Sequence, residues 1–280
     1  MAEYSAKDIS ALRKATGAGM MDCKNALEET DGILEDAMDW LRAKGLAKAG
    51  KLSEREATEG AVDVVVDGNV GAIVELNCNT DFVAKGSAFT GLLADITKQV
   101  AANGDGDVAA LPLGGSTVGD TLQQLAGKIG ENVVLGQVVR FESDGLLDAY
   151  RHNQNDRGTI AVLVEITGVD PTNQAAREVA HEIALHISFA APAYLTRDEV
   201  PADVIAREQA VIEEKSRNEG VPEAKLEGAV KGRLNAFYKD SVLLEQPSVK
   251  DPKVSIAKLV ESLGGDAKLT RFARVKVGED

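Results

Sequence analysis

This 280-residue chain contains three histidines, and two of them lie close enough in sequence to suggest a metal site. His181 and His186 enclose a glutamate in the segment His-Glu-Ile-Ala-Leu-His. Two histidines that bind one zinc ion from a helix stand four residues apart, so that both rings lie on the same face. A spacing of five residues turns the second ring about 140° away from the first. We therefore predict no metal site in this segment.

No nucleophile with its base, and no phosphate-binding loop, can be assembled from the other reactive residues. Cys78 lies at the inward end of a predicted strand, where a buried and inert thiol is expected. His152 stands near a strand end, where a lone histidine is more often a surface residue than a base. Gly17-Ala18-Gly19 is too short for a dinucleotide loop and follows a helix, not a strand. The sequence favours a binding protein without a cofactor over an enzyme.

An acid and an aromatic residue stand side by side at the end of a predicted strand. Asp81-Phe82 lies within Asn79-Thr80-Asp81-Phe82-Val83-Ala84-Lys85, after a strand over 70–78 that alternates apolar residues. Chains normally leave such a strand through glycine or polar residues. Phe82 is therefore either a plug of the core, the more frequent role of phenylalanine, or a wedge that enters a partner.

The charge of the chain argues against nucleic acid as a partner. Its 31 basic and 45 acidic residues give a formal charge of −14, whereas phosphate backbones are bound by basic surfaces. Two cysteines do not make a disulfide framework, and the N-terminus does not resemble a signal peptide. No segment approaches the roughly 20 apolar residues of a membrane span. We predict a cytoplasmic protein that binds neither nucleic acid nor membranes.

Residues 1 to about 45 are predicted to form three short helices. Ser5 and Asp8 are spaced as a helix-capping pair, and turns at 16–19 and 30–32 separate three apolar stripes. The stripes consist of Ile9, Leu12 and Thr16, then Met20, Cys23 and Leu27, then Ile33, Ala37, Trp40 and Leu41. Gly45 is the predicted end of the third helix, and a polar linker is predicted over 47–59. A unit this small buries little area, which is typical of a docking module.

The middle of the chain contains one pattern twice, at an offset of 87 residues. In the first copy Asp67-Gly68-Asn69 predicts a hairpin turn, and a helix is predicted from Ser87. Matching positions include Gly71 and Gly158, Ile73 and Ile160, Thr80 and Thr167, Ala88 and Ala175, and the helix stripes Leu92, Ile96, Val100 and Val179, Ile183, Ile187. Asp81-Phe82, however, corresponds to Gly168-Val169. A duplicated unit that keeps the aromatic in one copy favours the wedge interpretation.

Further helices are predicted after each copy. Val118, Leu122, Leu125 and Ile129 predict a helix that ends at Gly130. From Pro201, two helical stripes separated by Gly220-Val221-Pro222 predict an antiparallel hairpin inserted into the second copy. This hairpin can protrude, pair with another subunit or fold against the body. The chain then returns to the body with a helix through 256–263 and a strand over 269–277.

Three segments of the chain resemble the sequence signatures of the bacterial elongation factor Ts family. They are Thr16–Lys24, Asn77–Lys85 and Lys128–Asn132, in the order that the family has them. The resemblance runs from about Ser5 to Gly278. The chain departs from some members at its end, because it stops at Asp280 without their further helical module, and we expect any contact made by that module to be absent.

The resemblance implies an α+β fold with three parts. These are a three-helix ubiquitin-associated-type N-terminal domain, two duplicated α+β core subdomains with antiparallel sheet, and the inserted antiparallel helical hairpin. We expect the N-terminal domain with its linker over 1–55 and the first core subdomain over 56–143. The second subdomain is expected in two parts, 144–199 and 240–280, around the hairpin at 200–239.

The resemblance also implies a function. The family releases GDP from the translational GTPase elongation factor Tu, and it breaks no covalent bond in doing so. Asp81 and Phe82 would form the intruding tip, flanked by Thr80 and Val83. The other residues expected at the contact surface are Met20, Met21, Ile129, Gly130 and, with a weaker match, His152.

Two other functions are weighed against nucleotide exchange. A ubiquitin-associated-type adaptor would bind protein helices without releasing nucleotide, and a cysteine- or metal-dependent enzyme would turn over a substrate. Mixing the chain with a GDP-loaded translational GTPase separates the three, since only an exchange factor releases GDP at substoichiometric amounts. A homodimer through the helical hairpin is a further expectation.

Overall fold

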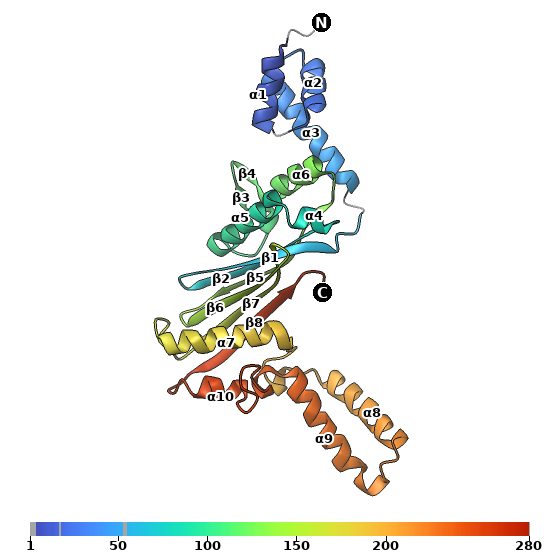
Figure 1. The fold of residues 1–280 in the computed structure, drawn as a ribbon, viewed down its shortest axis with the longest axis vertical. Helices are drawn as coiled ribbons and strands as arrows, with labels where there is room; N and C mark the ends of the chain where they lie inside the picture. Colours follow the sequence, from blue (N-terminus) through green and yellow to red (C-terminus); the bar gives the residue numbers. More distant parts are fainter. Residues whose placement is uncertain (1–3, 17, 53–54, 280) are drawn as a thin grey trace.

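The computed structural model describes residues 4–16, 18–52 and 55–279, without the side chains of 46–51. The molecule is elongated: helices α1 to α3 lie at one end, a helical hairpin at the other, and two three-stranded sheets with their covering helices lie between them (Figure 1). Gly17, in the first predicted turn, lies outside the described residues. No helix among the described residues is both long enough and apolar enough to span a bilayer.

The N-terminal unit consists of α1 (Ala6–Thr16), α2 (Met20–Glu29) and α3 (Leu34–Leu52). The predicted cap is present, because the Ser5 hydroxyl donates to Asp8 Oδ2 at 2.7 Å. The buried core of the unit is small and consists of Leu12, Cys23, Ala26, Leu27 and Ala37. The prediction that the third helix ends at Gly45 is wrong. α3 continues to Leu52, since one internal glycine costs a helix only about 1 kcal/mol and α3 packs on α6 (Val118–Ile129) in this region.

Two three-stranded antiparallel sheets form the body. The first has the order β1-β2-β5, from β1 (Glu59–Asp67), β2 (Val70–Cys78) and β5 (Val133–Glu142). The second has the order β6-β7-β8, from β6 (Leu146–Gln154), β7 (Arg157–Thr167) and β8 (Lys268–Lys276). Asp67 pairs with Val70 across Gly68-Asn69, as the hairpin signal predicted. A short ribbon of β3 (Pro112–Leu113) and β4 (Ser116–Thr117) precedes α6.

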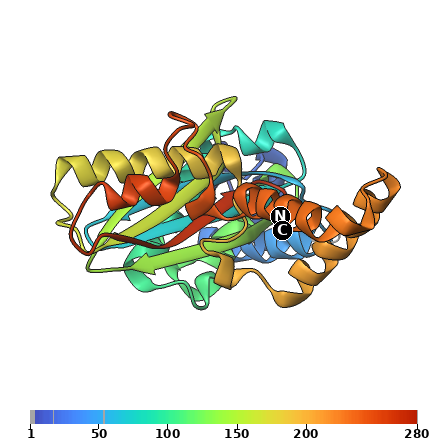
Figure 2. The same cartoon turned by 90° about the horizontal axis from the view of Figure 1, so that it is seen from below.

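The two sheets pack face to face, with helices on both outer faces (Figures 1 and 2). Ile73 of β2 and Leu163 of β7 are fully buried between the sheets. Gly71 permits this approach, because a Cβ there would lie 2.6 Å from Leu163 Cδ1. α5 (Ser87–Asn103) and α6 cover the first sheet, and α7 (Gln174–Ala190) and α10 (Ile256–Glu261) cover the second.

The internal repeat is confirmed in the structure. Each copy runs hairpin, helix and third strand, with β2 and β7 as the central strands. α5 and α7 begin and end 87 residues apart, at 87–103 and 174–190. Five of the six buried positions in each helix coincide at the same offset: Phe89 and Ala176, Leu93 and Ala180, Ile96 and Ile183, Thr97 and Ala184, Val100 and Ile187.

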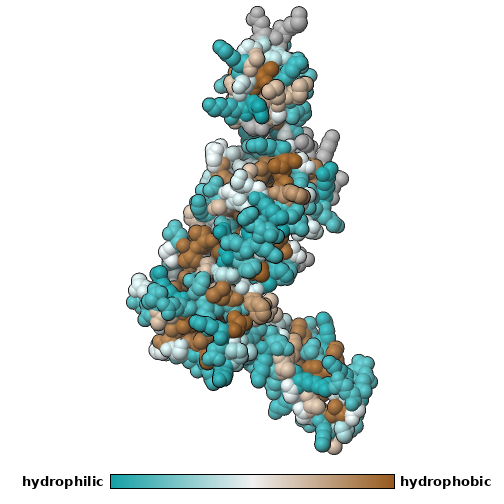
Figure 3. Space-filling view, in the orientation of Figure 1, coloured by the Kyte–Doolittle hydropathy of each residue, from teal (hydrophilic) through white to brown (hydrophobic). Residues whose placement is uncertain are grey.

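The helical hairpin consists of α8 (Ala202–Asn218) and α9 (Glu223–Ser241). Ile212, Leu226 and Val230 form its own small core. At its root, Tyr238 and Val242 pack with Val200. Short 3-10 turns lie at Val108–Ala110, Arg197–Glu199 and Leu243–Glu245. The face of the molecule seen in Figure 3 is mostly hydrophilic, with hydrophobic residues in separate small patches.

Candidate partner-binding site

The tip predicted to follow β2 is a short helix, α4 (Asp81–Ala84), that presents Phe82 to solvent. Thr80 caps α4 in an extended conformation, and its hydroxyl accepts from Val83 N at 3.4 Å. Ala84 is fully buried and Val83 partly buried against the first core. The Phe82 side chain, in contrast, is 84% exposed. Phe82 is therefore not a core plug, and the ring is free to enter a partner.

The segment after α6 holds the tip in place. α6 ends at Gly130, whose φ of 77° is the left-handed conformation that a helix end favours. The next residue, Glu131, accepts from Thr80 N at 3.0 Å and from Thr80 Oγ1 at 2.7 Å. Asn132 N donates to Asn79 Oδ1 at 2.8 Å. Two sequence signatures, 77–85 and 128–132, thus form one unit, and Ile129 and Gly130 directly precede the residues that hold the tip.

Glu131, Asn132 and Asn79 are positioning residues that the sequence reading did not single out. All three belong to the signature segments, so the signal was present in the sequence. Their role was missed because a hydrogen bond across 51 to 53 residues depends on tertiary packing. We call Asn79, Glu131 and Asn132 the tip clamp.

Asp81 is ionised and engaged with a neighbour on the same segment. Lys85 Nζ lies 2.6 Å from Asp81 Oδ2. This hydrogen bond is the main reason that the pKa of Asp81 is lowered, and the positive charges of Lys85 and Arg157 act in the same direction. Arg157 comes from the second repeat and pairs with Glu59 at 2.7 Å. The second repeat thus contributes to the electrostatics of the first repeat's tip.

Met20 and Met21 form a separate exposed surface on the N-terminal unit. They begin α2 and are 61% and 65% exposed. Exposed methionine side chains are polarisable and adaptable, which suits a contact with a partner. Arg42 of α3 connects this unit to the body through an ion pair of 3.3 Å with Asp120 of α6. The two methionines thus lie on a different unit from the Phe82 tip, and the two units are joined through α3 and α6.

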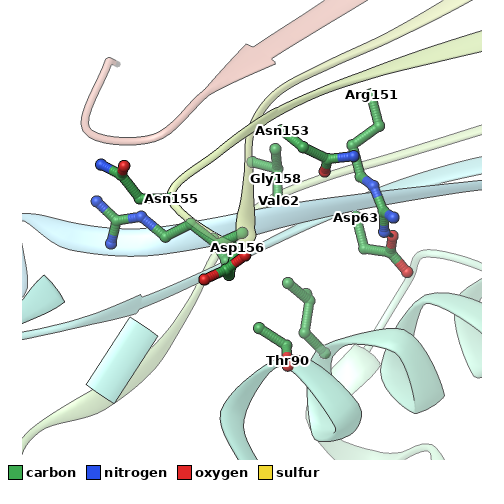
Figure 4. Close-up of a pocket in the computed structure, with 11 residues that line it drawn as sticks. Val62, Asp63, Thr90, Arg151, Asn153, Asn155, Asp156 and Gly158 are labelled. Atoms are coloured by element: carbon green, nitrogen blue, oxygen red, sulfur yellow. Dashed lines mark hydrogen bonds and ion pairs between the residues drawn. The ribbon is translucent and has the colours of Figure 1, made fainter. Parts of the chain in front are cut away.

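His152 is exposed on β6, and its Nδ1 lies 3.1 Å from the Tyr150 hydroxyl. The turn that follows, with Asn155 and Asp156 both at positive φ, lies over the first repeat. Figure 4 shows the resulting polar pocket between this hairpin, β1 and the first turns of α5, with Thr90 at one side. An ion pair of Arg151 with Asp63 of β1 joins the two repeats here. The hairpin that carries His152 thus packs beside the element that follows the tip.

The cysteine and the two histidines considered for catalysis or metal binding have surroundings that fit a role in the fold. Burial raises the pKa of the Cys78 thiol to about 11, and its Sγ donates to Thr80 O at 3.2 Å. His181 Nδ1 lies 3.0 Å from Asp148 Oδ2, whereas His186 is buried and its Nε2 lies 2.8 Å from Gln246 Oε1. The two imidazoles therefore have different partners. The described part of the chain contains no cluster of three or more side chains suited to a metal ion.

Comparison with known proteins connects this geometry to a family. The profile of the family described as Elongation factor TS matches residues 79–279. The chain is 44% identical to "Elongation factor Ts" of Saccharopolyspora erythraea, with 100% of each chain covered. It is 43% identical to that of Mycobacterium avium, over 100% of each chain, and 41% identical to that of Kineococcus radiotolerans, over 99% of this chain and 100% of the relative. The chain belongs to the elongation factor Ts family.

Proposed function

We propose that this protein is a guanine nucleotide exchange factor for elongation factor Tu, and that Phe82 is its wedge. The observation that carries the proposal is an aromatic ring, 84% exposed, on a four-residue helix. Exposure of a phenyl ring in water is unfavourable. Family membership adds the partner class, in both its GDP-bound and its nucleotide-free form.

The tip clamp suits this role because it makes the wedge rigid. Glu131 and Asn132 fix the backbone on which Phe82 stands, and Val83 and Ala84 anchor α4 in the core. A side chain held this way loses little conformational entropy on binding. Its binding free energy is then available to displace elements of the GTPase instead of ordering the tip.

The chemistry of GDP binding explains why a wedge suffices. GTPases hold the nucleotide largely through its phosphates and an octahedral Mg²⁺ ion with strict geometry. A shift of about an ångström in the elements around the ion weakens that site without any contact to GDP. By thermodynamic reciprocity, GDP then weakens the binding of the factor to the same extent. Each 1.4 kcal/mol of coupling changes affinity about tenfold, so a few kcal/mol accelerate release by several decades.

Release of a fluorescent GDP analogue from GDP-loaded elongation factor Tu tests the proposal. Substoichiometric wild-type chain should accelerate release, and Phe82→Ala should not. Phe189 is a matched control, because it is 81% exposed but lies at the end of α7 in the second repeat. Phe189→Ala should keep full activity. Binding without release would instead support the adaptor function, and equal loss in both variants would contradict a specific wedge.

A further inference from the structure

Gly127 allows α3 and α6 to cross in close contact. A Cβ at position 127 would lie 2.9 Å from the Gly45 carbonyl oxygen and 3.2 Å from Gly45 Cα. Both are backbone atoms, which cannot rotate away as a side chain can. Any residue other than glycine at 127 must therefore push α3 away from α6. Glycine inside a helix is less favourable than alanine, and the close crossing offsets that cost.

This crossing joins the two exposed surfaces of the candidate site. α3 carries the N-terminal unit and so the Met20-Met21 surface. α6 ends two residues after Gly127, at Ile129, and Glu131 of the tip clamp follows the capping residue Gly130. A rotation of α3 about the crossing would therefore move the methionines relative to Phe82.

Beside the crossing, the N-terminal unit and α6 are separated by an open cleft. It has a volume of about 340 Å³ and is lined by Thr16, Asp22 and Met38 on one side and by Gln124 and Lys128 on the other. The ion pair of Arg42 with Asp120 is partly exposed, with 52% and 34% of the side chains accessible, and such pairs contribute little to stability. The backbone contact at Gly127 thus helps to set the direction of the N-terminal unit.

We propose that the Gly127–Gly45 crossing is a positioning element that orients the Met20-Met21 surface and the Phe82 tip for simultaneous contact with the GTPase. The proposal rests on the proposed exchange function. Two linked contacts reinforce each other only when geometry lets both engage at once, and then the second contact gains a high effective concentration. The crossing supplies that geometry before binding.

Gly127→Ala tests the proposal, and the chain offers two matched glycine controls. Gly45 is the other glycine of the crossing, but a Cβ on Gly45 would meet nothing within 4 Å. Gly91, inside α5, also has nothing within 4 Å of its Cβ position. All three substitutions raise helix propensity equally, so only Gly127→Ala should displace α3.

The first measurement needs no GTPase. Spin labels on cysteines introduced at Glu29 of α2 and Lys98 of α5, both exposed, report the distance between the N-terminal unit and the body. Gly127→Ala should shift this distance, whereas Gly45→Ala and Gly91→Ala should leave it unchanged. Should Gly127→Ala unfold the chain, Arg42→Glu gives a second displacement, because it replaces the weak attraction to Asp120 with a repulsion between two carboxylates across α3 and α6. An unchanged distance in both variants overturns the proposal.

The second measurement is affinity for nucleotide-free elongation factor Tu by titration calorimetry. Gly127→Ala should lower affinity about tenfold, with the two control variants at the wild-type value. A shifted distance with unchanged affinity would refute the positioning role. Failure of the proposed function is a different result, in which the wild-type chain neither binds elongation factor Tu nor accelerates the release of GDP from it.

Discussion

At the end of β2 the chain forms a short helix that holds Phe82 in solvent, whereas at the equivalent end of β7 it turns through Gly168 and packs Val169. Gly168 has a φ of 72°, and Val169 lies partly buried against the second core. The two scaffolds otherwise match in strand order and in the buried positions of α5 and α7. The fold can therefore end this strand without an exposed aromatic, so packing does not explain Phe82.

The difference between the tips lies in the segment that precedes the third strand of each copy. Before β5, the Glu131 side chain reaches Thr80 and leaves room for α4. Before β8, the backbone itself closes in, because a Cβ on Gly168 would lie 2.2 Å from Asp266 O. A carboxylate spacer in one copy and a direct backbone contact in the other thus produce a projecting tip and a closed turn.

The largest effect should come from truncating the side chain at the Phe82 tip and comparing it with the same change at Val169. Phe82→Ala should slow GDP release at least about 100-fold, in the range of a hot-spot residue, and change stability by less than about 1 kcal/mol. Val169→Ala should cost about 1–2 kcal/mol of stability and leave release unchanged. Thermal unfolding and stopped-flow release on both variants check this. A destabilised Phe82→Ala protein with full exchange activity would overturn the wedge.

The closed turn should be sensitive to a single methyl group. Gly168→Ala should cost about 2–4 kcal/mol, because it adds positive-φ strain to the contact with Asp266. Gly264, with a φ of 73° and nothing within 4 Å of its Cβ position, controls for strain alone. Gly264→Ala should cost only about 1 kcal/mol. Denaturant unfolding measures both, and equal losses would show that the backbone contact is unimportant.

Glu131 of the tip clamp should matter more for nucleotide exchange than for folding. Glu131→Gln leaves one acceptor oxygen where two carboxylate oxygens accept from Thr80, and it also removes the charge that strengthens these bonds. Loss of about 1.5 kcal/mol of tip positioning would slow release about tenfold. Glu142→Gln, on the exposed end of β5, is the control and should be neutral. Wild-type release rates in Glu131→Gln would refute the clamp.

Asp81 should show a pH response only in acid. Because Lys85 lowers its pKa below the ordinary value of 3.8, the carboxylate is ionised at neutral pH. Any stabilisation from this pair is present above that value and is lost as pH falls through the lowered pKa. Lys85→Ala should move the Asp81 midpoint upward in an NMR titration and change release at pH 7 less than threefold. A midpoint that does not move would show that the pair is absent in solution.

The smallest effect should follow from trimming the hairpin, which only the second copy carries. Replacing residues 209–232 with a Gly-Ser link removes the Ile212, Leu226 and Val230 cluster but keeps the root around Tyr238 and Val242. Melting should stay cooperative and release unchanged. Light scattering on the same variant tests the proposed homodimer through the hairpin, since a dimer held there would become a monomer.

Local patterns predicted much of this fold. The repeat, the hairpin at Gly68-Asn69 and the helix end at Gly130 follow from period, turn chemistry and spacing, and the structure has each of them. The N-terminal cap at Ser5 was predictable for the same reason. The end of the third helix was not, because Gly45 is a sequence stop signal that the packing of α3 on α6 overrides.

The candidate site was predictable in its tip but not in its support. Comparing the two repeats identified Phe82 without coordinates, since Val169 occupies the equivalent position. The tip clamp and the approach of Arg157 depend on packing between segments 50 or more residues apart, and no local pattern encodes such contacts. The face-to-face arrangement of the sheets was missed for the same reason.

The pairing of Lys85 with Asp81 also sets the charge with which the tip meets its target. The chain carries a net charge of −14, and a nucleoside diphosphate such as GDP is itself strongly negative. An unpaired carboxylate beside Phe82 would add repulsion at short range, where salt screens least. With Lys85 at 2.6 Å the tip is close to neutral. Under the proposed exchange function, the tip of an acidic protein can thus approach bound GDP without an unpaired charge of its own beside Phe82.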